Sequence, residues 1–160
     1  MTQPSYDAGM RKASFADMNC SIAQSLEIIG EWWTLLILRD SFLGIRRFDD
    51  FVERLGISRN ILTTRLDKLV DAGILERRPY DTGRGRYDYL LTDKGRALWP
   101  VMVTIRQWGD EWIVGAGNEP VLLEHRDHGH TTTAQLTCDA CGEPLDARSV
   151  RAIPGPGDTR

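Results

Sequence analysis

The chain has 160 residues, of which 41% are hydrophobic and 27% are charged, a composition typical of a folded soluble protein. This length accommodates one ordinary domain with a small appendage and excludes two large domains. The longest apolar run, Trp32 to Leu38, is far shorter than the ~20 residues of a membrane-spanning helix. Residues 1–19 lack the apolar core of a secretory signal, so we expect a cytoplasmic protein.

The net charge of −3 conceals an uneven distribution of charge along the chain. Residues 54–96 carry ten Lys and Arg against six Asp and Glu, whereas the remainder is acidic. Binding of a polyanion depends on the local field and not on the charge of the whole chain. The basic middle of the chain is therefore a candidate nucleic-acid-binding region.

Apolar residues at helical spacing predict three helices in the first third of the chain. The first covers residues 21–29, with Ile22, Leu26 and Ile29 on one face, and the third covers 48–55 and closes at Gly56. The second covers residues 32–43, and its expected inward-facing residues are Trp33, Leu36, Ile37 and either Phe42 or Leu43.

The fourth predicted helix has the clearest local signal. Ser58 is a suitable N-cap, since its hydroxyl can accept a hydrogen bond from a free backbone N–H. An apolar stripe follows, and Gly73 ends the helix; the stripe consists of Leu62, Leu66, Leu69 and Val70. Only Gly56 and Ile57 separate the third helix from the cap, which is typical of a helix-turn-helix.

After Gly73 the pattern predicts a β-hairpin, with strands over residues 74–79 and 86–91 joined by the turn-forming sequence YDTGRG. Thr92 then caps a further helix, in which Pro100 is expected to produce a kink. One apolar seam runs along that helix, formed by Leu98, Val101, Ile105, Trp108 and Trp112.

These elements predict a mainly α-helical winged helix-turn-helix with a small β-hairpin wing and a small C-terminal Cys/His tail module. We expect a flexible arm over residues 1–19, the DNA-binding and dimerisation domain over 20–114 and a linker over 115–120. A small module, a candidate for zinc binding, is expected over 121–153, and a disordered tail over 154–160.

The predicted domain fits double-stranded DNA, because an α-helix fills the major groove and a hairpin reaches the neighbouring backbone or minor groove. The expected DNA-binding residues are Ser58, Arg59, Asn60, Thr63, Thr64, Arg65 and Lys68 on the helix and Arg77, Arg78, Arg84 and Arg86 on the hairpin. The alternatives are a merely solvated charged surface, or a winged helix that binds a protein partner and no DNA.

Several segments resemble the HxlR-type transcriptional regulators, which are related to the MarR group. They run from Cys20 to Trp112 and include IIGEWWTLLILRD, RRFDDF, LGISRNILTTRLDKLVDAGILERR, RYDYLLTDKGRALWPV and RQWGDEW. The resemblance implies a homodimeric DNA-binding regulator whose fourth helix recognises DNA and whose outer helices form the dimer.

The apolar seam independently favours a dimer, since five large residues on one helix exceed what a thin domain readily covers. A two-fold dimer would place two recognition helices in successive major grooves. The alternative is that the seam packs within its own chain.

Cys20 precedes the first helix, where the helix dipole favours a reactive thiolate. In several HxlR-like regulators a cysteine at this point senses oxidants or electrophiles, and the resemblance implies the same role here. The alternative is an ordinary packing cysteine.

All three histidines and two of the three cysteines lie in HRDHGH and CDACG. A CxxCG turn can place two thiolates on one tetrahedral zinc ion, and two imidazoles would complete the site. The preferred ligands are Cys138, Cys141, His128 and His130, with His125 in reserve. Longer HxlR-like chains commonly have a cysteine where His128 stands. The alternatives are two ordinary thiols without metal or, with less support, a thioredoxin-like pair.

No combination of residues typical of a catalytic site is present in the sequence. The adjacent pairs Asp49–Asp50 and Asp110–Glu111 are interpreted as solvated helix surface. We therefore expect no enzymatic activity and no required cofactor, while the sequence specifies no small-molecule effector.

Overall fold

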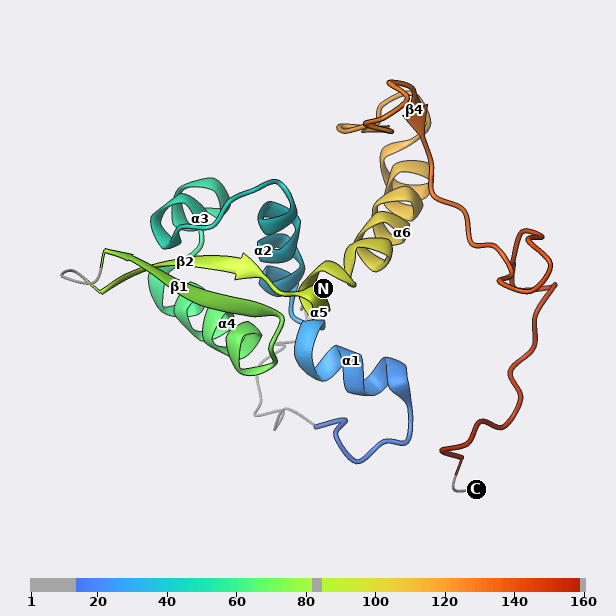
Figure 1. Ribbon diagram of the computed structural model, residues 1–160, viewed down its shortest axis with the longest axis horizontal. Coiled ribbons are helices and arrows are strands. Elements are labelled where there is room, and N and C mark those ends of the chain that lie inside the picture. The colour runs from blue at the N-terminus through green and yellow to red at the C-terminus, as the bar shows by residue number, and fades with distance from the viewer. Residues whose placement is uncertain (1–13, 82–84, 159–160) are drawn as a thin grey trace, which may run out of the picture.

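The computed structural model describes residues 14–81 and 85–158, and its elements follow the predicted order (Figure 1). The helices are α1 (Ser21–Ile29), α2 (Trp32–Phe42), α3 (Phe48–Leu55), α4 (Arg59–Asp71), α5 (Asp93–Arg96) and α6 (Trp99–Gly109), which continues into a π-helical turn, η2 (Asp110–Val114). The strands are β1 (Leu75–Asp81), β2 (Arg86–Leu91), β3 (Leu123–Glu124) and β4 (Thr131–Thr132). Among the described residues, no helix combines the length and hydropathy needed to cross a bilayer.

The helix-turn-helix of α3 and α4 is confirmed. Gly56 ends α3 in the left-handed region at φ 62°, which glycine adopts without steric cost. The Ser58 hydroxyl accepts a hydrogen bond from the Ile61 N–H at 3.3 Å, as expected of an N-cap. The stripe of α4 is buried as predicted, with Leu62, Leu66 and Leu69 each at 0% exposure.

The core lies between α2, α3, α4 and the base of the hairpin. Two predicted apolar faces are wrong in part. In α2, Ile37 is buried as expected, and Phe42, one of the two alternatives at the end of the helix, is half-buried, but Leu36 is exposed and Leu38 faces the core instead. In α1, the buried residue is Ala23, whereas the predicted face has Ile22 at 72% and Leu26 at 47% exposure.

A buried carboxylate links α2 to α3. Asp40 is fully buried and forms ion pairs with Arg39 at 2.9 Å and with Arg54 of α3 at 3.4 Å. Hydrogen-bonded pairing offsets the cost of removing a charge from water. Sequence patterning treated this face of α2 as apolar, because the position of Arg54 depends on the packing of a separate helix.

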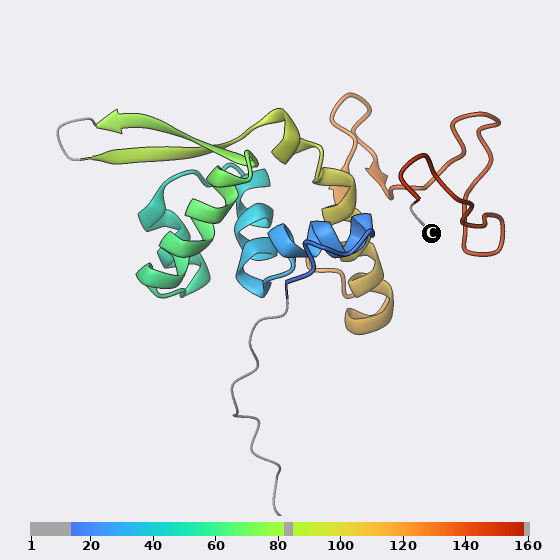
Figure 2. The same ribbon diagram turned by 90° about the horizontal axis from the view of Figure 1, so that it is seen from below.

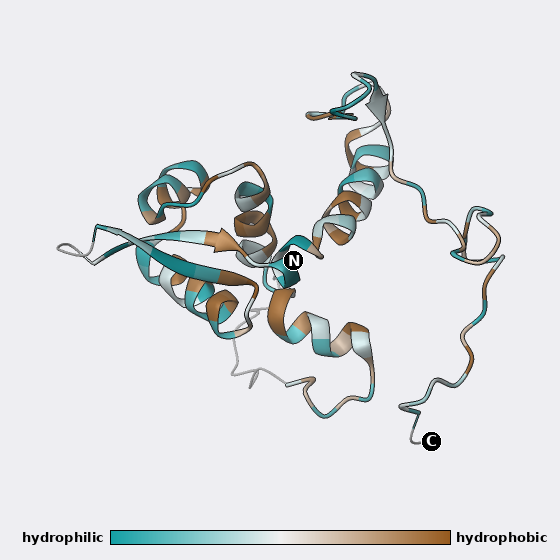
Figure 3. Cartoon of the chain, in the orientation of Figure 1, coloured by the Kyte–Doolittle hydropathy of each residue, from teal (hydrophilic) through white to brown (hydrophobic). Residues whose placement is uncertain are grey.

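β1 and β2 form the predicted antiparallel hairpin, in which Leu75 pairs with Leu91 at the base. Figure 3 shows that β1 is apolar at this base and hydrophilic toward the tip. The hairpin is also joined to the loop before α3, since the Tyr89 N–H donates to the Arg46 carbonyl at 2.7 Å. It projects as an arm beside α3 and α4 (Figure 2).

The connection to α6 differs from the predicted single kinked helix. Thr92 caps the four-residue α5, and a separate helix, α6, begins at Trp99. Pro100 therefore lies in the first turn of α6. Backbone N–H groups in a first turn form no hydrogen bond within the helix, so the proline costs the helix none. The break precedes the proline, so the predicted mid-helix kink is wrong.

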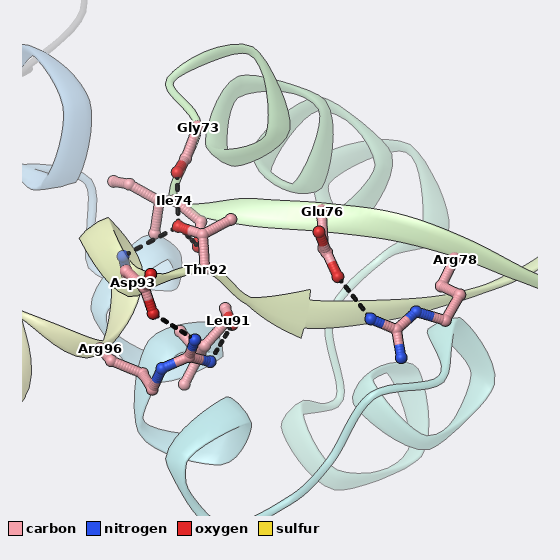
Figure 4. Close-up of polar contacts among 9 residues, drawn as sticks. Gly73, Ile74, Glu76, Arg78, Leu91, Thr92, Asp93 and Arg96 are labelled. Carbon is pink, nitrogen blue, oxygen red and sulfur yellow. Dashed lines mark hydrogen bonds and ion pairs between the residues drawn. The ribbon is translucent and has the colours of Figure 1, made fainter.

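Thr92 and Arg96 fasten α5 to the base of the hairpin (Figure 4). The Thr92 hydroxyl donates to the Gly73 carbonyl at 2.6 Å and accepts from the Gly95 N–H at 3.1 Å. Arg96 donates to the Leu91 carbonyl at 2.5 Å. These bonds couple the turn after α4, the base of the hairpin and α5.

Gly95→Ala should destabilise the domain by about 1–3 kcal/mol, as overpacking of a well-packed site does. A Cβ at this buried position would lie 2.2 Å from the Ile74 carbonyl oxygen, which belongs to the backbone. Urea unfolding followed by tryptophan fluorescence measures the change.

Gly109→Ala is the matched control for this measurement, because a Cβ on that helical glycine meets nothing within 4 Å. The control should leave the free energy of unfolding within about 0.5 kcal/mol of the wild type, or raise it. Equal stability of Gly95→Ala and the wild type would show that α5 is not held against the Ile74 backbone.

Among the described residues after η2, 115–158, none belongs to the buried core. This segment contacts α6 through Gln107, whose side-chain amide donates to the Ala134 carbonyl at 3.0 Å and accepts from the Ala134 N–H at 2.9 Å. Figure 1 shows the remaining chain running away from α6 toward the C-terminus.

Candidate nucleic-acid interface

A groove lies between α3, α4 and the hairpin, and it brings the exposed face of α4 and the hairpin onto one surface. Its lining residues are Phe48, Asp49, Arg59, Asn60, Thr63, Tyr80, Gly85, Arg86, Tyr87 and Tyr89. The helix and the hairpin therefore face the same side, which is the arrangement a winged helix needs to contact one duplex.

The first turns of α4 present polar side chains to this groove. Arg59, Asn60 and Thr63 are all exposed. The Thr63 hydroxyl donates to the Arg59 carbonyl at 2.9 Å, which fixes its rotamer on the helix surface. The N-terminal end of a helix also carries partial positive charge that attracts phosphate.

Arg59 is held at the mouth of the groove by α3. Its guanidinium forms an ion pair with Asp49 at 2.9 Å and lies 4.8 Å from the centre of the Phe48 ring. Both charged side chains are about two-thirds exposed, so the pair contributes little to stability. The ion pair orients the Arg59 side chain and leaves other N–H donors of its guanidinium accessible to a ligand.

The predicted hairpin arginines separate onto two faces. Arg77 forms an ion pair with Asp67 of α4 and lies 5.8 Å from the Tyr89 ring centre, so it faces α4. Arg78 pairs with Glu76 at 2.8 Å (Figure 4) and lines a different hollow, beside α5 and the end of α2. Arg84 lies outside the described residues.

Four predicted residues of the α4 region do not line the groove. The Arg65 side chain is 19% exposed and pairs with Glu31 at 3.1 Å, so it joins α4 to the start of α2. Lys68 is half-buried, and Thr64 donates its hydroxyl to the Asn60 carbonyl at 3.0 Å. Ser58 acts as the helix cap.

Sequence reasoning missed the arginines that precede α3. Arg46 and Arg47 pair with Asp88 of β2 at 3.5 and 3.7 Å, and Arg47 also lies 4.8 Å from the centre of the Tyr80 ring. These contacts fix the hairpin relative to α3. The signal was the RR dipeptide of RRFDDF, whose partner in a distant strand only the fold reveals.

The other predicted site residues lie apart from the groove. Cys20 is exposed and occupies the N-cap position of α1 without a side-chain cap hydrogen bond. Leu98 packs against the core of its own domain. Among the described residues, which include every histidine and cysteine, no three or more candidate metal ligands come together; the predicted set of Cys138, Cys141, His128 and His130 is not assembled.

A family model described as HxlR-like helix-turn-helix matches residues 28–116, more than half of the chain. The chain belongs to this family. It is a transcriptional regulator of the helix-turn-helix type, as the sequence predicted.

Known proteins support the same assignment for this HxlR-like regulator. The uncharacterized HTH-type transcriptional regulator Rv3095 of Mycobacterium tuberculosis is 43% identical over 137 residues, covering 86% of this chain and 87% of that protein. The crystal structure of PA1607, a candidate transcription factor, is 38% identical with a TM-score of 0.79 and covers 89% of this chain and all of that one. The redox regulator HypR in its reduced form is 28% identical with a TM-score of 0.53, covering 56% of this chain and 90% of its own.

Proposed function

We propose that this HxlR-like regulator binds double-stranded DNA sequence-specifically as a homodimer, with α4 in the major groove and the hairpin on the adjacent backbone or minor groove. The observation that carries the proposal is the shared groove, which presents Arg59, Asn60 and Arg86 together. Arg and Asn side chains make bidentate contacts with guanine and adenine edges. An arginine on a wing suits phosphate or a narrow minor groove.

The apolar surface of α6 and η2 supports the dimer. Val101, Ile105, Trp108 and Trp112 are exposed by 41%, 49%, 59% and 68%, and apolar colour recurs along α6 as it projects from the domain (Figure 3). Four large residues on one helical face form an apolar patch of the kind that marks a protein interface. The exposure argues against packing of these four within the chain.

Fluorescence anisotropy with labelled duplex DNA at increasing salt tests DNA binding. If the protein neutralises several phosphates, the logarithm of affinity should fall linearly with the logarithm of salt concentration, with a slope of about −0.9 per phosphate contact. A winged helix that recognises only a protein partner would show no affinity for duplex DNA at any salt concentration. That result would overturn the proposal.

Asp49→Asn should raise affinity for duplex DNA about twofold to fivefold, the equivalent of one exposed charge pair. The substitution removes a negative charge beside Arg59, inside the groove that would face phosphates. Asp50→Asn, which changes the neighbouring charge outside the groove lining, is the control and should have a smaller effect. Weaker binding by Asp49→Asn would instead show that Asp49 is needed to orient Arg59.

We further propose that Cys20 makes DNA binding responsive to electrophiles. Its thiol is exposed at the start of α1, and the similar protein HypR is a redox regulator. The sulfur would add to a quinone ring carbon, forming a C–S bond. The thiol proton goes to one quinone oxygen, and the proton of the attacked ring carbon shifts to the other, which leaves a hydroquinone bonded to Cys20.

Cys20→Ser should abolish the release of DNA that benzoquinone causes in the wild type. The Cys138→Ser/Cys141→Ser double variant is the control and should respond like the wild type. An unchanged quinone response in Cys20→Ser would assign sensing to another residue.

A further inference from the structure

The C-terminal segment contains two turns with the same backbone hydrogen bonds. In the first, the His125 N–H donates to the His130 carbonyl at 2.9 Å, and the Gly129 N–H donates to the His125 carbonyl at 2.8 Å. In the second, the Cys138 N–H donates to the carbonyl of residue 143 at 2.8 Å, and the N–H of residue 142 donates to the Cys138 carbonyl at 2.8 Å. The fifth residue of each turn is a glycine with positive φ, 65° and 76°.

The chain pairing on either side of the turns also matches. Around the first turn, Glu124 pairs with Thr131, one residue before the turn and one after it. Around the second, Thr137 pairs with Pro144 at the equivalent positions. One step further out, Leu123 pairs with Thr132 and the Leu145 N–H donates to the Leu136 carbonyl at 2.8 Å. The two turns are therefore two copies of one hairpin, with the motifs HxxHG and CxxCG at the same positions.

We propose that the two hairpins close on one Zn²⁺, with His125 and His128 from the first turn and Cys138 and Cys141 from the second as ligands. Two nitrogen and two sulfur donors in tetrahedral geometry are a common structural zinc site. By the shared hydrogen-bond pattern, His125 occupies the turn position equivalent to Cys138, and His130 the position equivalent to Glu143. The ligand set thus differs from the sequence-based expectation, which preferred His130.

The side chains support this choice within each turn. The His125 and His128 ring centres are 4.5 Å apart, whereas His130 is 5.8 Å from either. In the second turn, a side-chain hydrogen bond joins Cys138 and Cys141, so the two sulfur atoms lie close together.

The connection between the turns is long enough for closure. Gln107 fixes Ala134 against α6, and Ala134 is the middle one of the three residues, 133–135, that separate the paired Thr132 of the first hairpin from Leu136 of the second. Because an extended chain spans about 3.3–3.6 Å per residue, this short connection keeps the two hairpins near each other, and rotation about it would bring their turns together without breaking the Gln107 contact. Metal binding would then supply folding free energy to a segment that buries few side chains.

Metal analysis of the full-length protein, purified without an affinity tag, tests the proposal. We expect one zinc per chain in the wild type and in His130→Ala, and loss of zinc in His125→Ala, His128→Ala and Cys141→Ser. In the cobalt-substituted protein, a near-ultraviolet thiolate-to-cobalt band should appear and should vanish in Cys141→Ser.

Circular dichroism of each variant is the control, and an unchanged helical signal would show that zinc loss is not a consequence of unfolding of residues 20–114. Less than a tenth of an equivalent of zinc in the wild type after incubation with excess Zn²⁺ would overturn the site. Zinc loss in His130→Ala with retention in His125→Ala would overturn the ligand set. DNA binding is measured separately, so the outcome does not depend on the proposed function.

Discussion

Ile105→Glu should convert the protein from dimer to monomer and reduce its affinity for a two-half-site operator by about 10²–10⁴, the gain that linking two binding modules provides. Ile105 is half-exposed on α6, between Val101 and Trp108. In a dimer across this face the new carboxylate would be buried against apolar side chains without a partner, which is strongly unfavourable. Sedimentation equilibrium at micromolar protein and anisotropy on the operator measure the two effects.

Leu43→Glu is the matched control, since it also places an acid at an exposed aliphatic residue, at 63% exposure, but at the end of α2. The control should remain dimeric and keep its DNA affinity. Because Ile105 is exposed within one chain, its replacement should leave the fold of the monomer intact. If Ile105→Glu forms a dimer as stable as that of the wild type, α6 does not form the interface.

Arg59→Ala and Arg86→Ala should weaken DNA binding in different ways. Loss of a bidentate base contact by Arg59 should cost about 1–3 kcal/mol on the operator and little on unrelated DNA, so specificity falls. Loss of a phosphate contact by Arg86 should lower affinity equally on every sequence and reduce the salt slope by about one. Anisotropy titrations on operator and random duplexes at several salt concentrations separate the two patterns.

The ion pair of Arg59 with Asp49 is exposed, and its loss should change stability by less than about 1 kcal/mol. Urea unfolding of Arg59→Ala is therefore the control for an indirect effect. Equal losses on operator and random DNA would assign Arg59 to phosphate contacts. Full retention of affinity by both variants would place the DNA elsewhere on the molecule.

The features that could be predicted from sequence are local. The α4 stripe, the Ser58 cap, the Gly56 turn and the hairpin each depend on residues within a few positions of one another. Such interactions follow directly from helical periodicity, capping and turn chemistry. The alignment of α4 with the hairpin follows from that order of elements.

The features that could not be predicted depend on contacts between distant segments. The position of Arg65 on α4 predicts a DNA-binding residue, whereas in the structure Arg65 pairs with Glu31 at the start of α2. Asp40 lies in an apolar-looking helix and is buried because Arg54 reaches it from α3. Gly95 of α5 lies so close to the Ile74 carbonyl that a Cβ would not fit there, a contact with a segment about twenty residues earlier in the chain.

In the two C-terminal turns, the sequence shows the candidate zinc ligands but not which of them are equivalent. The motifs HxxHG and CxxCG are both visible in the sequence, but HxH spacing favoured His130 over His125. The backbone hydrogen bonds and strand pairing reveal that the turns are equivalent and thereby change the proposed ligands. Spacing alone does not specify which residues occupy matching positions in two turns.

Hydroxyl-radical footprinting of the wild-type protein on the DNA upstream of its own gene tests most directly whether α4 and the hairpin bind one duplex as a dimer. The dimer should protect two half-sites on one face of the DNA, centred about 10–10.5 base pairs apart or a multiple of that spacing, and Ile105→Glu should lose this protection. A single protected half-site that persists in Ile105→Glu, or no protection at low salt, would contradict this binding mode.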